Sequence, residues 1–116
     1  MVYGIISVDF GYRSGTIDVE AILYGPLAIT HFRDNKGNVK RASVIVHTAS
    51  GLTVTGGMTI KNAKKIIEKL LLIADWNMRT GYDIVETYPY VRAAIRRLET
   101  DPDADINEVM DSIRRS

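Results

Sequence analysis

The sequence contains no cysteine among its 116 residues. This absence excludes disulfide bonds, thiolate zinc sites and a cysteine nucleophile, and it is compatible with a reducing compartment. Apolar runs are also short, and none approaches the roughly 20 residues that a membrane-spanning helix requires. No positively charged stretch is followed by a long apolar core near the N-terminus, so we predict no secretion signal and no membrane contact. We expect a cytoplasmic location, in a cell or in an infected host.

An excess of charge of one sign is lacking as well. The 15 lysine and arginine residues are balanced by 14 aspartate and glutamate residues, which gives a net charge of +1. A general attraction of the whole protein to nucleic acid is therefore not indicated, and such binding would require a local basic patch. The hydrophobic fraction of 46% and the charged fraction of 25% are ordinary for a globular protein. At this length we predict a single domain over residues 1–116.

The periodicity of the apolar residues changes at Thr55–Thr59. Before this segment apolar and polar residues mostly alternate, which is typical of half-buried strands; after it, apolar residues recur every three or four positions, which is typical of amphipathic helices. Short turns rich in glycine, proline and asparagine divide the first half and favour an antiparallel meander. The predicted strands are Val2–Phe10, Thr16–Tyr24, Leu27–Arg33, Val39–Thr48 and Leu52–Thr55.

A sheet with one polar face requires cover only on the other face, and three helices are predicted to supply it. Thr59 is placed to cap the first helix and Gly81 to end it, while Pro89 suits the first turn of the second. Asp105 and Glu108 resemble a capping box before the last helix. The predicted fold class is α+β, with an antiparallel meander of four or five strands followed by one long and two shorter helices packed on one face. The predicted helices are Ile60–Arg79, Pro89–Glu99 and Ile106–Arg115.

The segment Gly4–Gly11, followed by Ile17–Val19, places Asp9 at the end of a predicted strand just before a glycine turn. Over residues 1–24 this pattern resembles the first hairpin of the ribonuclease H-like and actin-like ATPase folds. The resemblance implies a metal-dependent enzyme in which Asp9 binds the metal. Those folds also require a later parallel strand with further carboxylates, and no strand is predicted after the hairpin-rich half. The alternative is that Asp9 and Asp18 are polar strand residues near a turn.

Other candidate ligands have simpler explanations. His31 and His47 lie on adjacent predicted strands but lack a third metal ligand and the partners of a hydrolase triad, so we expect them to face solvent or to hydrogen-bond locally. The acidic residues in 101–107 alternate like a calcium loop but lack its glycine and final glutamate, and helix capping explains them better. Gly56-Gly57 suggests a phosphate cradle without the spacing of a phosphate-binding loop. We expect no catalytic residue, no cofactor and no metal site.

Two groups of basic residues on the predicted helices are candidate contacts for an anion or a nucleic acid. Tyr88 and Tyr90 lie near the second group, and such aromatic side chains could stack on bases. The alternative is that both groups are ordinary solvent-exposed helix faces. The candidates are Lys61, Lys64 and Lys65 in the first helix and Arg92, Arg96 and Arg97 in the second.

The first predicted helix is apolar over a wider face than contact with one sheet requires. Leu72, Ile73 and Trp76 widen this face in the second half of the helix. These three residues are either covered by the helices that follow or form an interface with a protein partner or a second copy, because exposed aromatic patches usually mark contacts.

No motif in the sequence defines a reaction, so the functional prediction concerns a class of protein. We predict a small non-enzymatic protein-binding module that acts through protein–protein contacts, as a regulator or inhibitor of the kind that phages and mobile elements encode. A homodimer is one arrangement of such a module. The alternative is a protein that binds nucleic acid weakly through its basic helix faces. A metal-dependent ribonuclease H-like enzyme is the third hypothesis, and it rests on the Asp9 hairpin alone.

Overall fold

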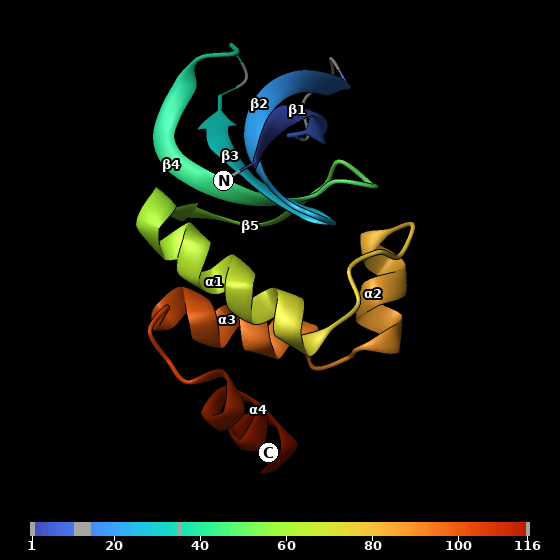
Figure 1. Cartoon of the computed structure of the whole chain (residues 1–116), viewed down its shortest axis with the longest axis vertical. Coiled ribbons are helices and arrows are strands. Elements are labelled where there is room, and N and C mark those ends of the chain that lie inside the picture. Colours follow the sequence, from blue (N-terminus) through green and yellow to red (C-terminus); the bar gives the residue numbers. More distant parts are fainter. Residues whose placement is uncertain (1, 11–14, 35, 116) are drawn as a thin grey trace.

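The computed structural model describes residues 2–10, 15–34 and 36–115, and these residues form an α+β fold (Figure 1). An antiparallel sheet of five strands is followed by four helices, which confirms the predicted fold class. The strands are β1 (Val2–Asp9), β2 (Thr16–Tyr24), β3 (Leu27–Arg33), β4 (Val39–His47) and β5 (Thr53–Met58). The helices are α1 (Ile60–Ile73), α2 (Gly81–Thr87), α3 (Val91–Thr100) and α4 (Ile106–Arg115).

The strands form a meander in the order β1-β2-β3-β4-β5, and each strand pairs antiparallel with the next. β1 and β2 pair over their full length, from Val2 opposite Leu23 to Asp9 opposite Thr16. The predicted turn residues 11–14, between these strands, and Asn35, in the predicted turn between β3 and β4, lie outside the described residues. The short connections explain why strands that are adjacent in the sequence are also adjacent in the sheet.

The last strand extends beyond the end that the sequence predicted, Thr55, as far as Met58. In the sequence-based prediction Gly56 and Gly57 follow the strand and suggest a phosphate cradle before the first helix. Instead, the pairing of β4 with β5 shifts register near these residues, and a Cβ on Gly56 would lie only 2.7 Å from Cγ1 of Val44. Gly56 therefore allows a close approach of two strands, and the two glycines belong to the sheet and not to a phosphate cradle.

Both faces of the sheet are buried around β3 and β4, whereas the sequence predicted one polar face. Leu27, Ile29 and Ile45 contact the helices, while Ala28 and Val44 belong to a second core cluster on the opposite face. The sheet curls, so that β1 and β2 fold over this second face (Figure 1). The prediction of a polar face was wrong because the alternation in one strand does not reveal how strongly the whole sheet curls.

The curl is closed where the end of β1 meets the turn between β4 and β5. The backbone N–H of Asp9 donates to the carbonyl oxygen of Gly51 at 2.7 Å, and Asp9 forms a parallel bridge with Leu52. Gly51 has a φ of 73°, and a Cβ there would lie 2.8 Å from the carbonyl oxygen of Ser7. Only glycine satisfies both the left-handed backbone and the close contact, so this turn depends on Gly51.

The helical half differs from the prediction at the end of the first helix. α1 begins after the predicted cap, Thr59, whose Oγ1 accepts from the N–H of Asn62 at 3.2 Å, but it ends at Ile73 and not near Arg79. Gly81 begins α2 instead of ending α1. The prediction was wrong because apolar spacing continues past the helix, where Trp76 folds back into the core.

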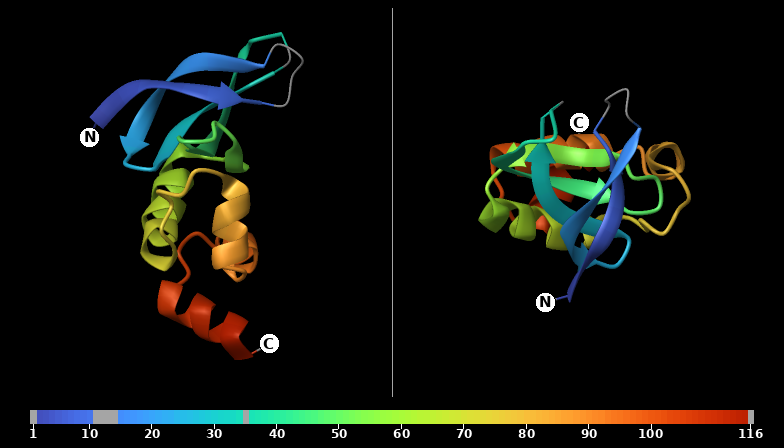
Figure 2. Two further views of the ribbon diagram at one scale, coloured as in Figure 1. Left: turned by 90° about the vertical axis from the view of Figure 1, so that its right-hand side faces the viewer. Right: turned by 90° about the horizontal axis from the view of Figure 1, so that it is seen from above.

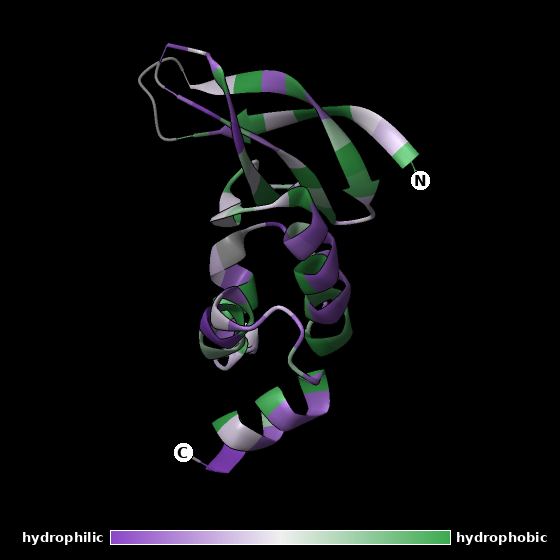
Figure 3. Cartoon of the chain, turned by 90° about the vertical axis from the view of Figure 1, so that its left-hand side faces the viewer, coloured by the Kyte–Doolittle hydropathy of each residue, from purple (hydrophilic) through white to green (hydrophobic). Residues whose placement is uncertain are grey.

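The helices form layers on one side of the sheet (Figure 2). α1 contacts β3 and β4, and α3 packs against α1. α4 packs on α3 through a small cluster that contains Ala94, Val109 and Met110, at the end of the molecule opposite the sheet. Apolar and polar residues alternate along α4 in Figure 3, as in an amphipathic helix. None of the helices in the described part of the chain is long and apolar enough to cross a membrane.

Candidate functional site

The edge strand β1 carries three of the exposed large apolar side chains. Val2, Tyr3 and Ile5 are 63%, 69% and 64% exposed. No residue from Val2 to Val8 is charged. β1 pairs with β2 along one side; on its other side Asp9 forms a bridge with Leu52, and Gly51 lies against the carbonyl oxygen of Ser7. Because edge strands usually carry charges or prolines that prevent pairing with another chain, this uncharged edge is a candidate contact surface.

A hollow of about 340 Å³ lies between the sheet and the first turn of α1. Exposed apolar side chains of Tyr3, Val39 and Ile60 contribute to its lining, together with Ser43 of β4. Ser43 is fully buried, and its Oγ has no hydrogen-bond partner in the part of the chain that the structure describes. A buried hydroxyl without a partner is unusual, and the sequence offered no signal for it, because serine is common in strands of either exposure.

A groove of about 680 Å³ lies between β5, α2 and α3. Apolar side chains dominate its lining, and Leu52 and Tyr82 on its walls are 48% and 76% exposed. Glu86 and Arg92 supply one charge of each sign. The sequence did not predict this groove, because α2 was not expected and its residues had no assigned neighbours.

His47 lies at the inner end of this groove and is 1% exposed. Its Nε2 lies 2.8 Å from the carbonyl oxygen of Trp76, and its Nδ1 lies 2.8 Å from Oγ of Ser50. Since a carbonyl oxygen only accepts, Nε2 carries the hydrogen and donates it, and in the neutral ring Nδ1 accepts from the Ser50 hydroxyl. A serine–histidine pair was not predicted, although both residues lie in the same tight turn.

The chemistry of this pair differs from that of a hydrolase triad. The histidine is oriented by a backbone carbonyl, where a triad has a carboxylate that stabilises the imidazolium. The hydrogen bond between His47 and Ser50 is local to the β4–β5 turn, whereas the hydrogen bond from His47 to Trp76 joins this turn to the segment between α1 and α2. We therefore assign the pair a structural role: it fastens the turn to the helical layer.

The predicted metal ligands are not brought together. In the pairing of β3 with β4, His31 lies opposite Ser43, whereas His47 lies opposite Leu27. The two histidines are therefore separated by four residue positions along the strand direction, which is about 13 Å. Ser7 Oγ donates to Oδ1 of Asp18 at 2.7 Å. Among residues 2–10, 15–34 and 36–115, no three histidine or acidic side chains are placed to hold a metal ion.

The resemblance of the Asp9 hairpin to ribonuclease H-like folds does not extend to the architecture. The sheet is an antiparallel meander, and in the described residues after β5 the chain forms only helices and their connections. The later parallel strand that would bring further carboxylates to Asp9 does not follow α1.

In the acidic segment before α4, Asp105 acts in helix capping, as predicted. Oδ1 of Asp105 accepts hydrogen bonds from the N–H groups of Asn107, at 2.8 Å, and Glu108, at 3.3 Å. Oδ1 of Asp101 accepts from the N–H of Asp103 at 3.2 Å. The Asp105 carboxylate satisfies backbone donors that the start of α4 leaves open, whereas the Asp101 carboxylate stabilises a turn in the α3–α4 connection.

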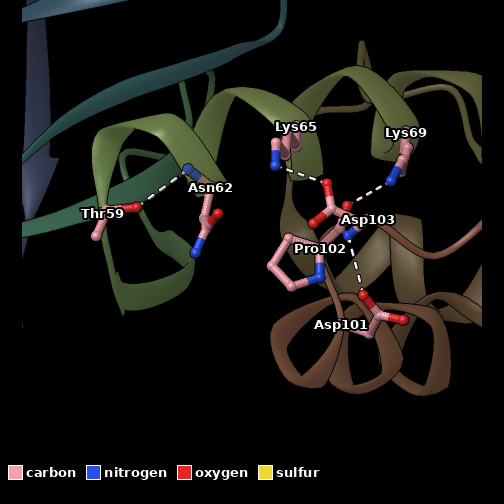
Figure 4. A network of polar contacts seen from close by, with 7 residues as sticks. All are labelled: Thr59, Asn62, Lys65, Lys69, Asp101, Pro102 and Asp103. Carbon is pink, nitrogen blue, oxygen red and sulfur yellow. Dashed lines mark hydrogen bonds and ion pairs between the residues drawn. The ribbon is translucent and has the colours of Figure 1, made fainter.

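Part of the lysine group contacts the α3–α4 connection (Figure 4). Nζ of Lys65 lies 2.6 Å from Oδ1 of Asp103, and Nζ of Lys69 donates to the carbonyl oxygen of Pro102. The Lys65 ammonium, through its hydrogen bond and its charge, lowers the pKa of Asp103 below its ordinary value, and the charges of Lys69 and Lys61 act in the same direction. Lys61 is exposed and Lys64 half-buried on the same helix.

The three arginines of α3 lie in different surroundings. Arg92 lines the large groove, while Nη2 of Arg97 donates to Oγ of Ser112 in α4 at 2.5 Å, and Arg96 is exposed. Tyr88 and Tyr90 contact each other edge to face, and the Tyr90 hydroxyl donates to the carbonyl oxygen of Ile73 at 2.6 Å. The two tyrosines pack against the core, which leaves them poorly placed for stacking on bases.

The three residues predicted to widen the apolar face of the first helix do not form one exposed surface. Trp76 is 3% exposed, and its Nε1 donates to the carbonyl oxygen of Leu70 at 2.7 Å. Ile73 is half-buried and packs against two core clusters, whereas Leu72 is 75% exposed. Of the two alternatives for Trp76, burial agrees with cover by the rest of the chain, because the chain leaves the helix before reaching Trp76 and its side chain turns inward. An interface on this side stays a prediction, and it would depend on Leu72.

Comparison of the chain with models of protein families, with curated proteins and with solved structures found no match in any of the three.

Proposed function

We propose that this chain is a small cytoplasmic protein-binding module that acts through protein–protein contacts. The observation that carries the proposal is the edge of β1, where seven consecutive uncharged residues, Val2–Val8, include three strongly exposed apolar side chains. An exposed strand edge binds extended segments through backbone hydrogen bonds, while alternate side chains supply the apolar contacts. Such binding requires no cofactor and no catalytic residue.

The nucleic-acid hypothesis receives less support from the contacts of the basic residues. Lys65 and Lys69 are engaged by the α3–α4 connection, and Arg97 is engaged by Ser112. Among the remaining candidates, Lys61 lies near the start of α1, whereas Arg92 lines the large groove. A nucleic-acid backbone is best bound by several cations along one line, and Lys61 and Arg92 lie on different elements.

Affinity purification of the tagged protein from its native host tests the proposal. We expect the wild-type chain to retain a protein partner, and Ile5→Lys to lose it, because a charge at the strand edge opposes pairing with another chain. Leu72→Lys and Tyr82→Lys are matched controls, since both also place a lysine at a strongly exposed apolar position. Loss of the partner in a control, with retention in Ile5→Lys, would move the contact to α1 or to the groove.

A further inference from the structure

We propose that the hollow between the sheet and the first turn of α1 receives a tyrosine side chain of the protein partner, whose hydroxyl forms a hydrogen bond with Oγ of Ser43. This inference rests on the proposed function, and it adds the type of side chain that anchors the partner. The lining of the hollow includes both Ser43 and the exposed Tyr3 of β1.

Ser43 lies on the sheet face that carries the hollow. It is opposite His31 in the pairing of β3 with β4, and His31 also lines the hollow. Directly paired residues of neighbouring strands point to the same face of a sheet, so the Ser43 side chain shares this face. Ser43 is fully buried, and its Oγ has no hydrogen-bond partner among the described residues. The hollow therefore contains a donor and acceptor that the described chain leaves unused.

Apolar side chains separate Ser43 from solvent. Tyr3, Val39 and Ile60 are exposed large apolar residues that line the hollow, and the buried Ile29 lines it as well. A group that reaches Ser43 must therefore combine an apolar body, which replaces water against these walls, with a polar tip. Ile60 is exposed in the first turn of α1, where a rapid change of rotamer can admit the tip to the buried hydroxyl.

The charges on the walls favour an uncharged occupant. With His31 counted as neutral, Glu20 and Arg33 supply one charge of each sign among the lining residues. The walls therefore attract neither an anion nor a cation strongly. A charged tip would also lose its hydration beside the Ser43 hydroxyl without gaining an opposite charge there.

Tyrosine meets these requirements better than other side chains. Its rigid ring is apolar, its hydroxyl lies at the tip, and this hydroxyl donates and accepts hydrogen bonds as the hydroxyl of Ser43 does. The volume of about 340 Å³ lies near the lower end of the range of roughly 300–1,000 Å³ that is usual for ligand sites, which suits one large side chain. Tyrosine is also enriched at protein interfaces, where anchors of this kind fill pockets of the partner.

Binding of p-cresol, which has the structure of a tyrosine side chain, tests the site without the partner. Toluene is the matched control, because it lacks only the hydroxyl. We expect p-cresol at millimolar concentration to shift the NMR signals of the Ser43 and Ile60 amides, and to bind about 2- to 10-fold more tightly than toluene, which corresponds to one net hydrogen bond. Ser43→Ala should abolish this preference, whereas Ser50→Ala, which removes a hydroxyl from the lining of the large groove, should retain it.

Three results of this titration would overturn the inference. They are the absence of shifts in the hollow, equal affinities of p-cresol and toluene for the wild type, and a preference for p-cresol that persists in Ser43→Ala.

Photochemical crosslinking identifies the side chain in the complex with the host partner. A benzophenone amino acid in place of Lys61, which is exposed and follows Ile60 in α1, should crosslink beside a tyrosine of the partner. Replacing that tyrosine by phenylalanine should weaken binding to the wild type about 2- to 10-fold, and should not weaken binding to Ser43→Ala further.

The two proposals can fail separately. If Ile5→Lys releases the partner but no tyrosine of the partner responds to Ser43→Ala, the proposed function stands and the tyrosine anchor fails. If Ile5→Lys retains a partner whose tyrosine still responds to Ser43→Ala, the tyrosine anchor stands and the contact along β1 fails.

Discussion

Two buried polar side chains of β4, His47 and Ser43, differ in how their hydrogen-bonding groups are satisfied. Both ring nitrogens of His47 have partners, on Ser50 and on Trp76. Ser43 Oγ has none among the described residues. A buried polar group without a hydrogen bond lowers the stability of the fold, whereas a hydrogen-bonded one contributes modestly to it. Removing the side chain should therefore lower the free energy of unfolding at His47 but not at Ser43.

We expect His47→Ala to lower the free energy of unfolding by about 2–4 kcal/mol, because it removes two hydrogen bonds and leaves a cavity beneath the β4–β5 turn. Urea unfolding followed by circular dichroism measures the change. His31→Ala is the matched control on the neighbouring strand, and because His31 is exposed its effect should stay within about 0.5 kcal/mol. Equal effects of the two substitutions would contradict the structural role of His47.

For Ser43→Ala we expect no loss of stability, or a gain of up to about 1 kcal/mol, since a hydroxyl without a partner leaves the core. Ser50→Ala is the comparison, and it should cost about 1 kcal/mol because Ser50 supplies the hydrogen bond to His47. Both values come from urea midpoints under identical conditions. A clear loss of stability in Ser43→Ala would mean that its Oγ has a hydrogen-bond partner.

At the scale of the elements, the α3–α4 connection is held to α1 by polar contacts. Lys65 pairs with Asp103, and Lys69 binds the carbonyl oxygen of Pro102 (Figure 4). α4 itself contacts the rest of the molecule mainly through α3. The terminal helix therefore depends on a small apolar cluster and on a few exposed polar contacts.

The lowered pKa of Asp103 gives the Lys65 contact a defined pH dependence. A carboxyl whose pKa is lowered by folding contributes stability that is fully present above its unfolded pKa, about 3.9, and is lost as the pH falls through the folded value. We expect Asp103→Asn to lower the urea midpoint slightly at pH 7, and to have no effect in strong acid. In the Lys65→Gln background the same substitution should have a smaller effect, because only the charges of Lys69 and Lys61 still favour the carboxylate of Asp103. Persistence of the effect at 1 M salt would contradict an exposed ion pair.

Hydrogen exchange should distinguish α4 from α1. We expect the amides of α4 to exchange through local opening, with lower protection factors than those of the buried turns of α1, because the α4 cluster contains few buried side chains. Exchange measured by NMR or mass spectrometry in dilute urea separates local from global opening. Equal protection of the two helices would show that α4 unfolds only with the whole domain.

At the scale of the whole molecule, the two charge signs are nearly balanced and the basic side chains are distributed over several elements. This distribution bears on the hypothesis of nucleic-acid binding. The affinity of a protein for a nucleic acid falls steeply with salt when several phosphates are neutralised.

We expect any binding to random DNA or RNA to be weak, with a Kd on the order of micromolar or higher, and to disappear near physiological salt. Fluorescence anisotropy in a salt titration measures it, with Lys61→Glu/Lys64→Glu and Arg92→Glu/Arg96→Glu as the charge-reversed variants. Tight binding that either variant abolishes would make nucleic acid the preferred partner. Loss of a protein partner in either variant would instead mark a polar docking surface.

Much of the fold follows from local patterns. The strand boundaries of β2 and β3, the cap at Thr59 and the cap at Asp105 agree with the sequence-based predictions, because alternation and capping involve residues close together in the chain. The position of β1 at the edge of the sheet could also have been inferred, because Val2–Val8 is uncharged and belongs to the first strand of the meander. The groove and the contact of His47 with Trp76 could not, because each joins segments about 30 or more residues apart.

The sequence by itself determined the division into a strand half and a helix half, the order of the strands and the starts of α1 and α4, because each depends on hydrophobic periodicity, capping residues and short turns. Only the tertiary structure decided that the sheet curls until Asp9 meets the Gly51 turn, that α1 stops at Ile73, and that Trp76 turns inward beside His47. The physical reason is that these features minimise exposed apolar surface and unsatisfied polar groups across the whole molecule, and no single segment carries that information.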